Sequence, residues 1–173
     1  LVPELERLRL SSVDPVEIDE DIWKLLENEP RFMPYLHLSL QAGCDVILKR
    51  MKRRHLTADA AAVVARARAL RPDIGIGADI IAGFPTEDEE LFAQTLEFVR
   101  ANALPYLHVF PYSERPGTPA ARMPAVAVAE RKARAARLRA QGAQAARDFH
   151  TRLIGQPLRV LLDSATAGHS EEF

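Results

Sequence analysis

Four short stretches of the chain alternate apolar side chains with small or polar ones: residues 7–12, 37–41, 75–83 and 107–112. Side chains on a β-strand repeat their direction every two residues, so each stretch would carry one apolar and one polar face. In the second stretch three leucines share one face, and His37, Ser39 and Gln41 share the other. The alternation predicts strands with one face in a core and the other turned toward a ligand.

The third stretch places an acid among glycines. Isoleucine and alanine form its apolar row, while Gly75, Gly77, Asp79 and Gly83 belong to the opposite row. Asp79 therefore faces a space that the glycines keep open. An exposed antiparallel sheet gives the same alternation without any function, so the connections between the strands must decide.

Helices are predicted between the strands. Asp19 is the expected cap of the first helix, and Thr57 that of an alanine-rich helix ending near residue 70. Thr86 and Glu89 have the spacing of a capping box for the third helix. Strands that alternate with helices imply right-handed crossovers and a parallel sheet, with a site in the loops after the carboxyl ends of the strands. The polar faces would then line a barrel-like lumen.

Composition bounds the class of protein. The 173 residues can bury one core, and the net charge of -1 implies no general attraction to nucleic acid or membrane. No apolar run approaches the roughly 20 residues that cross a bilayer. The single cysteine, Cys44, excludes an internal disulfide. We therefore expect a cytoplasmic protein that does not associate with membranes.

The two ends predict a piece of a longer protein. The chain starts with Leu1, and residues 158–162 have the pattern of a new strand with few residues after it. Four parallel strands with helices on one side would also leave an open sheet edge.

Two basic segments leave alternatives open. The first is Lys49, Arg50, Lys52, Arg53 and Arg54. It is either a solvated helix end or a binder of carboxylate or phosphate. The second is Arg131, Lys132, Arg134, Arg137 and Arg139, on a helix predicted over residues 128–150. For this segment a solvated helix face is favoured over contact with an RNA backbone.

Four sequence motifs carry a resemblance to a known family: LSSVDP at residues 10–15, HLSLQAG at 37–43, DIIAGFP at 79–85 and HVFPYSERPGTPAA at 108–121. In this order they resemble the radical S-adenosylmethionine (SAM) methylthiotransferases, and the resemblance covers nearly the whole chain. The last motif and the LSS opening are similar to the branch that modifies threonylcarbamoyladenosine beside the tRNA anticodon. Sister branches act on isopentenyladenosine in tRNA or on an aspartate of a ribosomal protein.

The resemblance implies an α/β fold and a division of the chain. Residues 1–125 would be the C-terminal part of a partial, TIM-like (β/α) radical SAM barrel, and residues 126–155 a connecting helix. Residues 156–173 would be the truncated start of a small, TRAM-like β-barrel that binds RNA. The amino-terminal cluster domain of the family would be missing.

The resemblance also implies cofactors and partners. Such enzymes use SAM and two 4Fe–4S clusters, whose cysteine ligands are absent here, so Cys44 is expected to be an incidental thiol. The chain alone is then expected to be inactive. Expected partners of the whole enzyme are the anticodon stem-loop of tRNA and a reductant protein, and the enzyme is expected to be a monomer.

Ten residues are predicted to form the binding site. The predicted cofactor-binding residues are Ser39, Gln41, Arg50, Arg54, Asp79 and Gly83. The predicted substrate-binding residues are Tyr112, Ser113, Arg115 and Thr118.

Other roles stay open for several residues of this set and its neighbours. Asp79 is either a contact of the adenosine or a buried acid paired with a neighbouring strand. Arg115 either meets an RNA phosphate or braces a turn, and His37 and His108 are expected to be interior hydrogen-bonding residues. The sequence departs from the family pattern at Ser39, Ala42, Cys44, Ala78 and Thr86.

Two competing hypotheses belong to other classes. The chain could act alone as an RNA-binding module, through its basic helix and incomplete final barrel. It could also be an unrelated, aldolase-like barrel enzyme. That hypothesis needs a lysine inside the lumen, and none of the four inward rows contains one.

Overall fold

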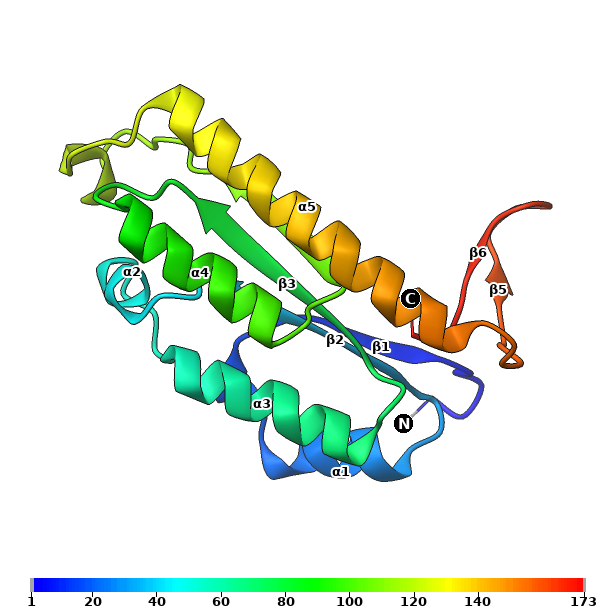
Figure 1. Ribbon diagram of the computed structural model, residues 1–173. Coiled ribbons are helices and arrows are strands. Elements are labelled where there is room, and N and C mark those ends of the chain that lie inside the picture. Colours follow the sequence, from blue (N-terminus) through cyan, green and yellow to red (C-terminus); the bar gives the residue numbers. More distant parts are fainter. Residues whose placement is uncertain (1, 173) are drawn as a thin grey trace.

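The four alternating stretches form the four strands of one parallel sheet. A computed structural model describes residues 2–172. The strands are β1 (Leu8–Val13), β2 (Phe32–Gln41), β3 (Gly75–Ala82) and β4 (Tyr106–Pro111), and they lie in the order β1-β2-β3-β4 (Figure 1). All three pairings are parallel. The predicted α/β fold with a parallel sheet is therefore confirmed.

Helices connect the strands and cover one face of the sheet. The longer helices are α1 (Glu20–Asn28), α3 (Thr57–Leu70), α4 (Glu89–Ala101) and α5 (Val128–Leu153). The short helical segments are η1 (Pro15–Glu17), α2 (Asp45–Arg50) and η2 (Ala120–Arg122). Figure 1 shows α4 and α5 running side by side across the sheet, with α3 and α1 further along the same side. None of the helices in the described part of the chain combines the length and apolar character that a membrane crossing requires.

The apolar rows of the strands form the core beneath these helices. Leu36, Leu38 and Leu40 of β2 are fully buried, as are Ile76 and Ile80 of β3. The helices contribute the buried side chains Leu26, Val64, Phe92 and Leu138 to the same cluster. On the other face of the sheet, the β4 side chain Phe110 is 53% exposed. The two faces therefore differ as the alternation predicts.

The first predicted helix cap is confirmed and the other two are wrong. Asp19 Oδ1 accepts hydrogen bonds from the backbone N–H groups of the first turn of α1. At α3, Thr57 is the first helical residue, and the preceding Leu56 N–H donates to the Asp59 carboxylate. At α4 the cap is Asp88, which accepts from the Leu91 N–H at 2.9 Å. An acid lies directly before the first turn of α4, so Thr86 is left in the preceding loop.

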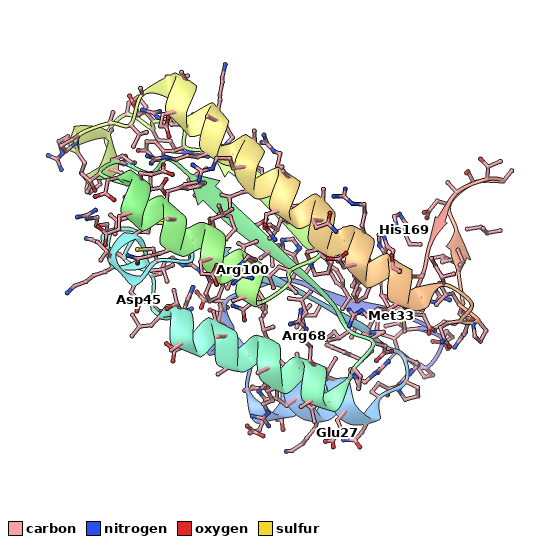
Figure 2. All side chains as sticks on the ribbon, in the orientation of Figure 1. Glu27, Met33, Asp45, Arg68, Arg100 and His169 are labelled. Carbon is pink, nitrogen blue, oxygen red and sulfur yellow. The ribbon has the colours of Figure 1, made fainter. Side chains whose placement is uncertain are left out.

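The C-terminal segment forms a separate pair of very short strands. The strand expected at residues 158–162 is limited to β5 (Leu161–Leu162), which pairs antiparallel with β6 (Gly168–His169). This pair lies beyond the end of α5 (Figure 1). Figure 2 shows His169 on β6 at the end of the molecule opposite to Asp45, where α2 begins. Beyond β6 the chain returns to the sheet, where Arg9 Nη2 donates to the Ser170 carbonyl at 2.9 Å.

Two arginines of α5 correct the prediction of a fully solvated basic face. Arg131 and Arg134 are only 6% and 5% exposed, whereas Lys132 and Arg137 remain on the surface. Arg134 Nη1 donates to Glu87 Oε1 at 3.0 Å and to the Glu87 carbonyl at 2.8 Å. The acidic partner comes from the loop after β3, far away in the sequence, so the local charge pattern could not reveal it. These contacts fix α5 against the barrel.

We expect Arg134→Ala to lower the free energy of unfolding by about 3 kcal/mol, because it leaves the buried Glu87 carboxylate without its cation. The matched control is Arg137→Ala, which removes an exposed pair with Glu89 and should cost less than about 1 kcal/mol. Urea unfolding followed by circular dichroism measures both variants. Equal losses in the two variants would contradict a structural role for the buried pair.

Candidate functional site

The carboxyl ends of three neighbouring strands turn sharply. Ser12 in β1, Gln41 at the end of β2 and Gly83 directly after β3 have φ angles of 56°, 69° and 74°. Residues other than glycine rarely adopt this left-handed region. Ser12 and Gln41 therefore carry a conformational cost, and such strained positions concentrate at functional sites.

A cavity of about 520 Å³ lies at this end of the sheet. Its walls come from β2, β3, β4 and the loop after β4. Six of the ten predicted binding residues line it: Gln41, Asp79, Tyr112, Ser113, Arg115 and Thr118. The volume falls within the range of about 300–1,000 Å³ that is usual for small-molecule sites. The structure therefore brings together most of the residues that the strand ends predict.

A second cavity of about 460 Å³ adjoins the first and shares Gln41, Tyr112 and Thr118 as wall residues. It adds a seventh predicted residue, Arg50, whose Nη1 donates to the Thr86 carbonyl at 3.1 Å. Arg53 also lines this second cavity. The two adjoining cavities therefore extend from the polar end of β2, at Gln41, to a basic rim formed by Arg50 and Arg53.

Asp79 occupies the wall of the first cavity and is also paired with both neighbouring strands. Its Oδ1 lies 3.0 Å from Nε2 of His37 and 3.4 Å from Nδ1 of His108. The parallel register places His108 directly opposite Asp79 and His37 opposite Gly77. The predicted pairing of Asp79 with a neighbouring strand is therefore found, on a side chain that is 22% exposed, and its contact with adenosine stays a prediction.

The two histidines differ in burial. The side chain of His37 is 4% exposed, and its Nδ1 lies 3.0 Å from the Tyr35 hydroxyl. Burial raises the pKa of Tyr35, so this hydroxyl stays protonated at neutral pH. The prediction of an interior hydrogen-bonding residue is confirmed for His37. For His108 it is wrong on burial, because that side chain is 57% exposed on the edge strand β4.

Three predicted binding residues lie outside the two cavities. Arg54 Nη2 donates to Glu17 Oε1 at 2.6 Å, and the Ser39 carbonyl accepts from Arg53 Nη2 at 2.7 Å. At Gly83 an added Cβ would lie 2.6 Å from Cγ of Arg131. The missing side chain at Gly83 therefore makes room for α5, and that surface is not open to a ligand.

Besides Pro111 and Ala120, sequence reasoning missed two lining residues of the first cavity, Ile81 of β3 and Phe110 of β4. Both belong to the inward rows, where they are apolar among polar or small neighbours. An isolated apolar side chain in a polar row is the signal that could have identified them. Together they supply an apolar wall, and the ring of Phe110 can stack on a flat ligand.

The described residues do not provide the donor set of an iron–sulfur cluster. Cluster iron is held by several cysteine thiolates, and this chain has one cysteine. Cys44 is buried, packs in a cluster with Leu48 and Phe84, and its Sγ contacts Gln94 Oε1 at 3.2 Å. No step of chemistry is therefore assigned to a cluster on these residues.

A buried ion pair supports the loops beside the site. The Asp14 carboxylate, after β1, accepts from Arg53 Nη2 at 2.8 Å, and the same Nη2 reaches the end of β2. Burial alone would raise the pKa of Asp14, but the hydrogen bond from the Val16 N–H and the nearby Arg53, His55 and Arg54 outweigh it. The pKa of Asp14 therefore lies below its usual value.

The fold and the cavity define a class, a (β/α) barrel segment with a ligand site at the carboxyl ends of its strands. Residues 4–99, more than half of the chain, match the Radical SAM superfamily. The chain belongs to that superfamily, and membership implies SAM and 4Fe–4S clusters as cofactors.

The relatives are longer than this chain. The threonylcarbamoyladenosine tRNA methylthiotransferase MtaB of Rickettsia prowazekii is 50% identical over 173 residues, which are 100% of this chain and 41% of the relative. MtaB of Thermotoga maritima is 38% identical over 94% of this chain and 38% of its own length. The tRNA-2-methylthio-N(6)-dimethylallyladenosine synthase of Shewanella sediminis is 36% identical over 97% of this chain and 36% of its own length. These relatives confirm the resemblance to methylthiotransferases, and the chain spans about two fifths of their length.

A solved structure has the same fold. Coproporphyrinogen III oxidase (HemN) from Escherichia coli, a radical SAM enzyme, superposes with a TM-score of 0.58 at 22% identity, over 84% of this chain and 32% of that one. At this identity the likeness concerns the fold alone. It supports the barrel geometry.

The lowered pKa of Asp14 gives a pH prediction. The stability that its carboxylate contributes is present above the unfolded value of 3.8 and is lost as the pH falls through the lower folded value. We expect Asp14→Asn to be less stable than the parent near neutral pH and to lose less stability on acidification.

Urea unfolding from neutral pH to below pH 3.8 tests this expectation. The control is Asp21→Asn, whose carboxyl is 82% exposed in a surface pair with Lys24. If the free energies of unfolding of Asp14→Asn and of the parent chain changed in parallel with pH, the lowered pKa of Asp14 would be contradicted.

Proposed function

We propose that this chain is the cofactor- and substrate-binding part of a tRNA methylthiotransferase that modifies threonylcarbamoyladenosine next to the anticodon. The observation that carries the proposal is the 50% identity with the R. prowazekii MtaB along all 173 residues. The S. sediminis dimethylallyladenosine synthase reaches 36% over a similar span. The higher value favours the threonylcarbamoyladenosine branch.

The cavity at the strand ends would hold SAM. Gln41 and Asp79 supply hydrogen-bonding groups for ribose hydroxyls and an amino group, and Ile81 and Phe110 supply an apolar wall for a flat ring. Arg50, on the rim of the adjoining cavity, is the candidate partner of the cofactor's carboxylate. Gln41, Asp79 and Arg50 would hold SAM in place, and the bound cofactor, together with a cluster held by protein outside these residues, would supply radical abstraction of hydrogen from an unreactive carbon.

The loop after β4 would receive the RNA. Tyr112, Ser113, Arg115 and Thr118 line the cavity on this side, and Arg115 and Ser113 are exposed. Arg115 is our candidate for a phosphate contact because a guanidinium binds phosphate oxygens in a bidentate manner. The remaining predicted residues would support the site indirectly. Ser39 would do so through its contact with Arg53, and Gly83 through its close packing against Arg131. Arg54 would do so through its pair with Glu17.

The remaining parts of the enzyme follow from the same proposal. Cluster ligands would come from protein outside these residues, and a reductant protein would supply electrons. We propose the division into residues 1–125, 126–155 and 156–173, with β5 and β6 beginning a TRAM-like RNA-binding barrel. We further propose that the whole enzyme acts as a cytoplasmic monomer.

A chimera tests the branch assignment. The matching segment of the R. prowazekii MtaB is replaced by this chain and expressed in a bacterial strain that lacks its own MtaB. We expect mass spectrometry of digested tRNA to show the methylthio group restored on threonylcarbamoyladenosine. Restoration of the methylthio group on dimethylallyladenosine instead would refute the assignment to the threonylcarbamoyladenosine branch.

Two variants of the chimera test the site. Gln41→Ala should lower the yield of the modified nucleoside about tenfold, the factor expected from one lost hydrogen bond of roughly 1.4 kcal/mol. Lys132→Ala, on the exposed side of α5, should leave the yield unchanged. Equal yields from the two variants would contradict a role of Gln41 in binding.

The isolated chain should not assemble a cluster. After anaerobic treatment with iron and sulfide and desalting, we expect no visible charge-transfer absorption and no bound sulfide, because one buried cysteine cannot replace several thiolates. Cys44→Ser should behave identically. A stable cluster that disappears in Cys44→Ser would show that the chain takes part in ligation.

A further inference from the structure

Three side chains at the base of the cavity offer a set of metal ligands that needs no cysteine. His37, Asp79 and His108 each contribute one ligand atom, and these atoms all lie within 4.8 Å of one another. Asp79 Oδ1 is 3.0 Å from His37 Nε2 and 3.4 Å from His108 Nδ1. Around a tetrahedral zinc ion, with bonds of about 2.0–2.2 Å, neighbouring ligand atoms lie roughly 3.3–3.5 Å apart. The two distances to Asp79 are close to this spacing, and the two histidine nitrogens lie within 4.8 Å of each other.

The Tyr35 hydroxyl can support either tautomer of His37, including the one that a metal requires. His37 Nδ1 lies 3.0 Å from the Tyr35 hydroxyl. Without a metal, His37 Nε2 donates to Asp79 Oδ1 and Nδ1 accepts from the Tyr35 hydroxyl. When a metal replaces the proton on Nε2, the ring carries its proton on Nδ1 and the Tyr35 oxygen accepts it, which is an outer hydrogen bond of the kind that orients metal-binding histidines. A Cβ at position 77 would collide with both His37 Nδ1 and the Tyr35 hydroxyl. Gly77 therefore keeps this pair in place.

Burial and access are also those of a metal site. The exposed fractions of the three side chains are 4% for His37, 22% for Asp79 and 57% for His108, so the set is open on one side. Asp79 lines the cavity of about 520 Å³. An ion can reach the set from the cavity through Asp79, the member of the set that lines it.

We propose that His37 Nε2, Asp79 Oδ1 and His108 Nδ1 bind one divalent transition-metal ion, with Zn²⁺ as the preferred ion, at the base of the cavity. Two imidazoles and one carboxylate suit zinc or ferrous iron, whereas magnesium and calcium prefer all-oxygen sites. A fourth coordination position would present a water molecule or a ligand group to the cavity. This site uses side chains other than thiolates. It shares Asp79 with the proposed SAM pocket, but its test requires neither SAM nor a cluster.

The test uses the full 173-residue chain, freed of metal with a chelator that is then removed. Co²⁺ serves as a spectroscopic substitute for Zn²⁺. We expect one equivalent of Co²⁺ to give the visible absorption of a four-coordinate site, and Zn²⁺ to displace it. Zn²⁺ should also raise the melting temperature of the chain, because a ligand that binds only the folded state stabilises it.

Matched variants locate the ion. His108→Gln and Asp79→Asn should weaken Co²⁺ binding by more than about tenfold, and Tyr35→Phe by about tenfold through the tautomer of His37. The control is His169→Gln on β6, which removes another histidine–carboxylate pair, with Asp163 at 3.2 Å, and should bind as the parent does. Circular dichroism checks that each variant is folded.

His108→Gln is the decisive variant, because that side chain is 57% exposed and its replacement leaves the core intact. Absence of bound Co²⁺ in the parent chain, or equal affinity in His108→Gln and the parent, would overturn the proposal. Loss of binding in His169→Gln would do the same, because it would place the ion at β6.

Discussion

The two-residue repeat of four parallel strands is the constraint on which the rest of this structure depends. The helices bury one row of each strand, for example Leu38 and Ile80, and the alternate row must then face the other side. The parallel register decides which polar atoms meet there. It sets His108 opposite Asp79, and it sets a glycine opposite His37. The polar cluster at the base of the cavity is therefore a consequence of core packing.

The long helix α5 holds the loops at the carboxyl ends of the strands. Glu87 Oε1 accepts from the Gly83 N–H at 3.0 Å and from Arg134 at the same distance, so one carboxylate joins the end of β3 to the helix. Arg131 Nη1 donates to the Tyr112 carbonyl at 3.2 Å, which joins the end of β4 to the same helix. Both walls of the cavity are thus fixed from the covered side of the sheet, which leaves the inner side available for a ligand.

The sequence predicts what depends on local periodicity, and it fails where distant partners or a competing residue close by decide. The strands and the Asp19 cap depend on neighbours two or three residues away, and all are confirmed. The charges of Arg131 and Arg134 resemble a solvated face until Glu114 and Glu87 are placed beside them by the fold. Thr86 has the spacing of a cap, but Asp88 lies nearer to the first turn and takes that role.

The same distinction applies to the candidate site. The cavity is lined by residues of the inward rows and of the loop after β4, such as Gln41, Asp79 and Thr118. Their positions follow from the two-residue repeat of each strand and from the order of the strands in the sheet. Arg54 could not be placed in this way, since a long side chain on a short connection can turn to either side. Arg54 pairs with Glu17 and does not line the cavity, and this pairing is a contact between separate segments of the chain.

The C-terminal residues determine from which end a ligand can enter. Arg9 of β1 donates to the carbonyl groups of Ser170 and Glu171, and Glu172 is buried against the amino-terminal end of the sheet. Burial and the nearby Glu172 raise the pKa of Tyr106, at the start of β4, to about 12. The amino-terminal end of the inner face is therefore covered by the chain itself. Access to Asp79 is left to the carboxyl-terminal end, where the basic rim formed by Arg50 and Arg115 would favour anionic ligands.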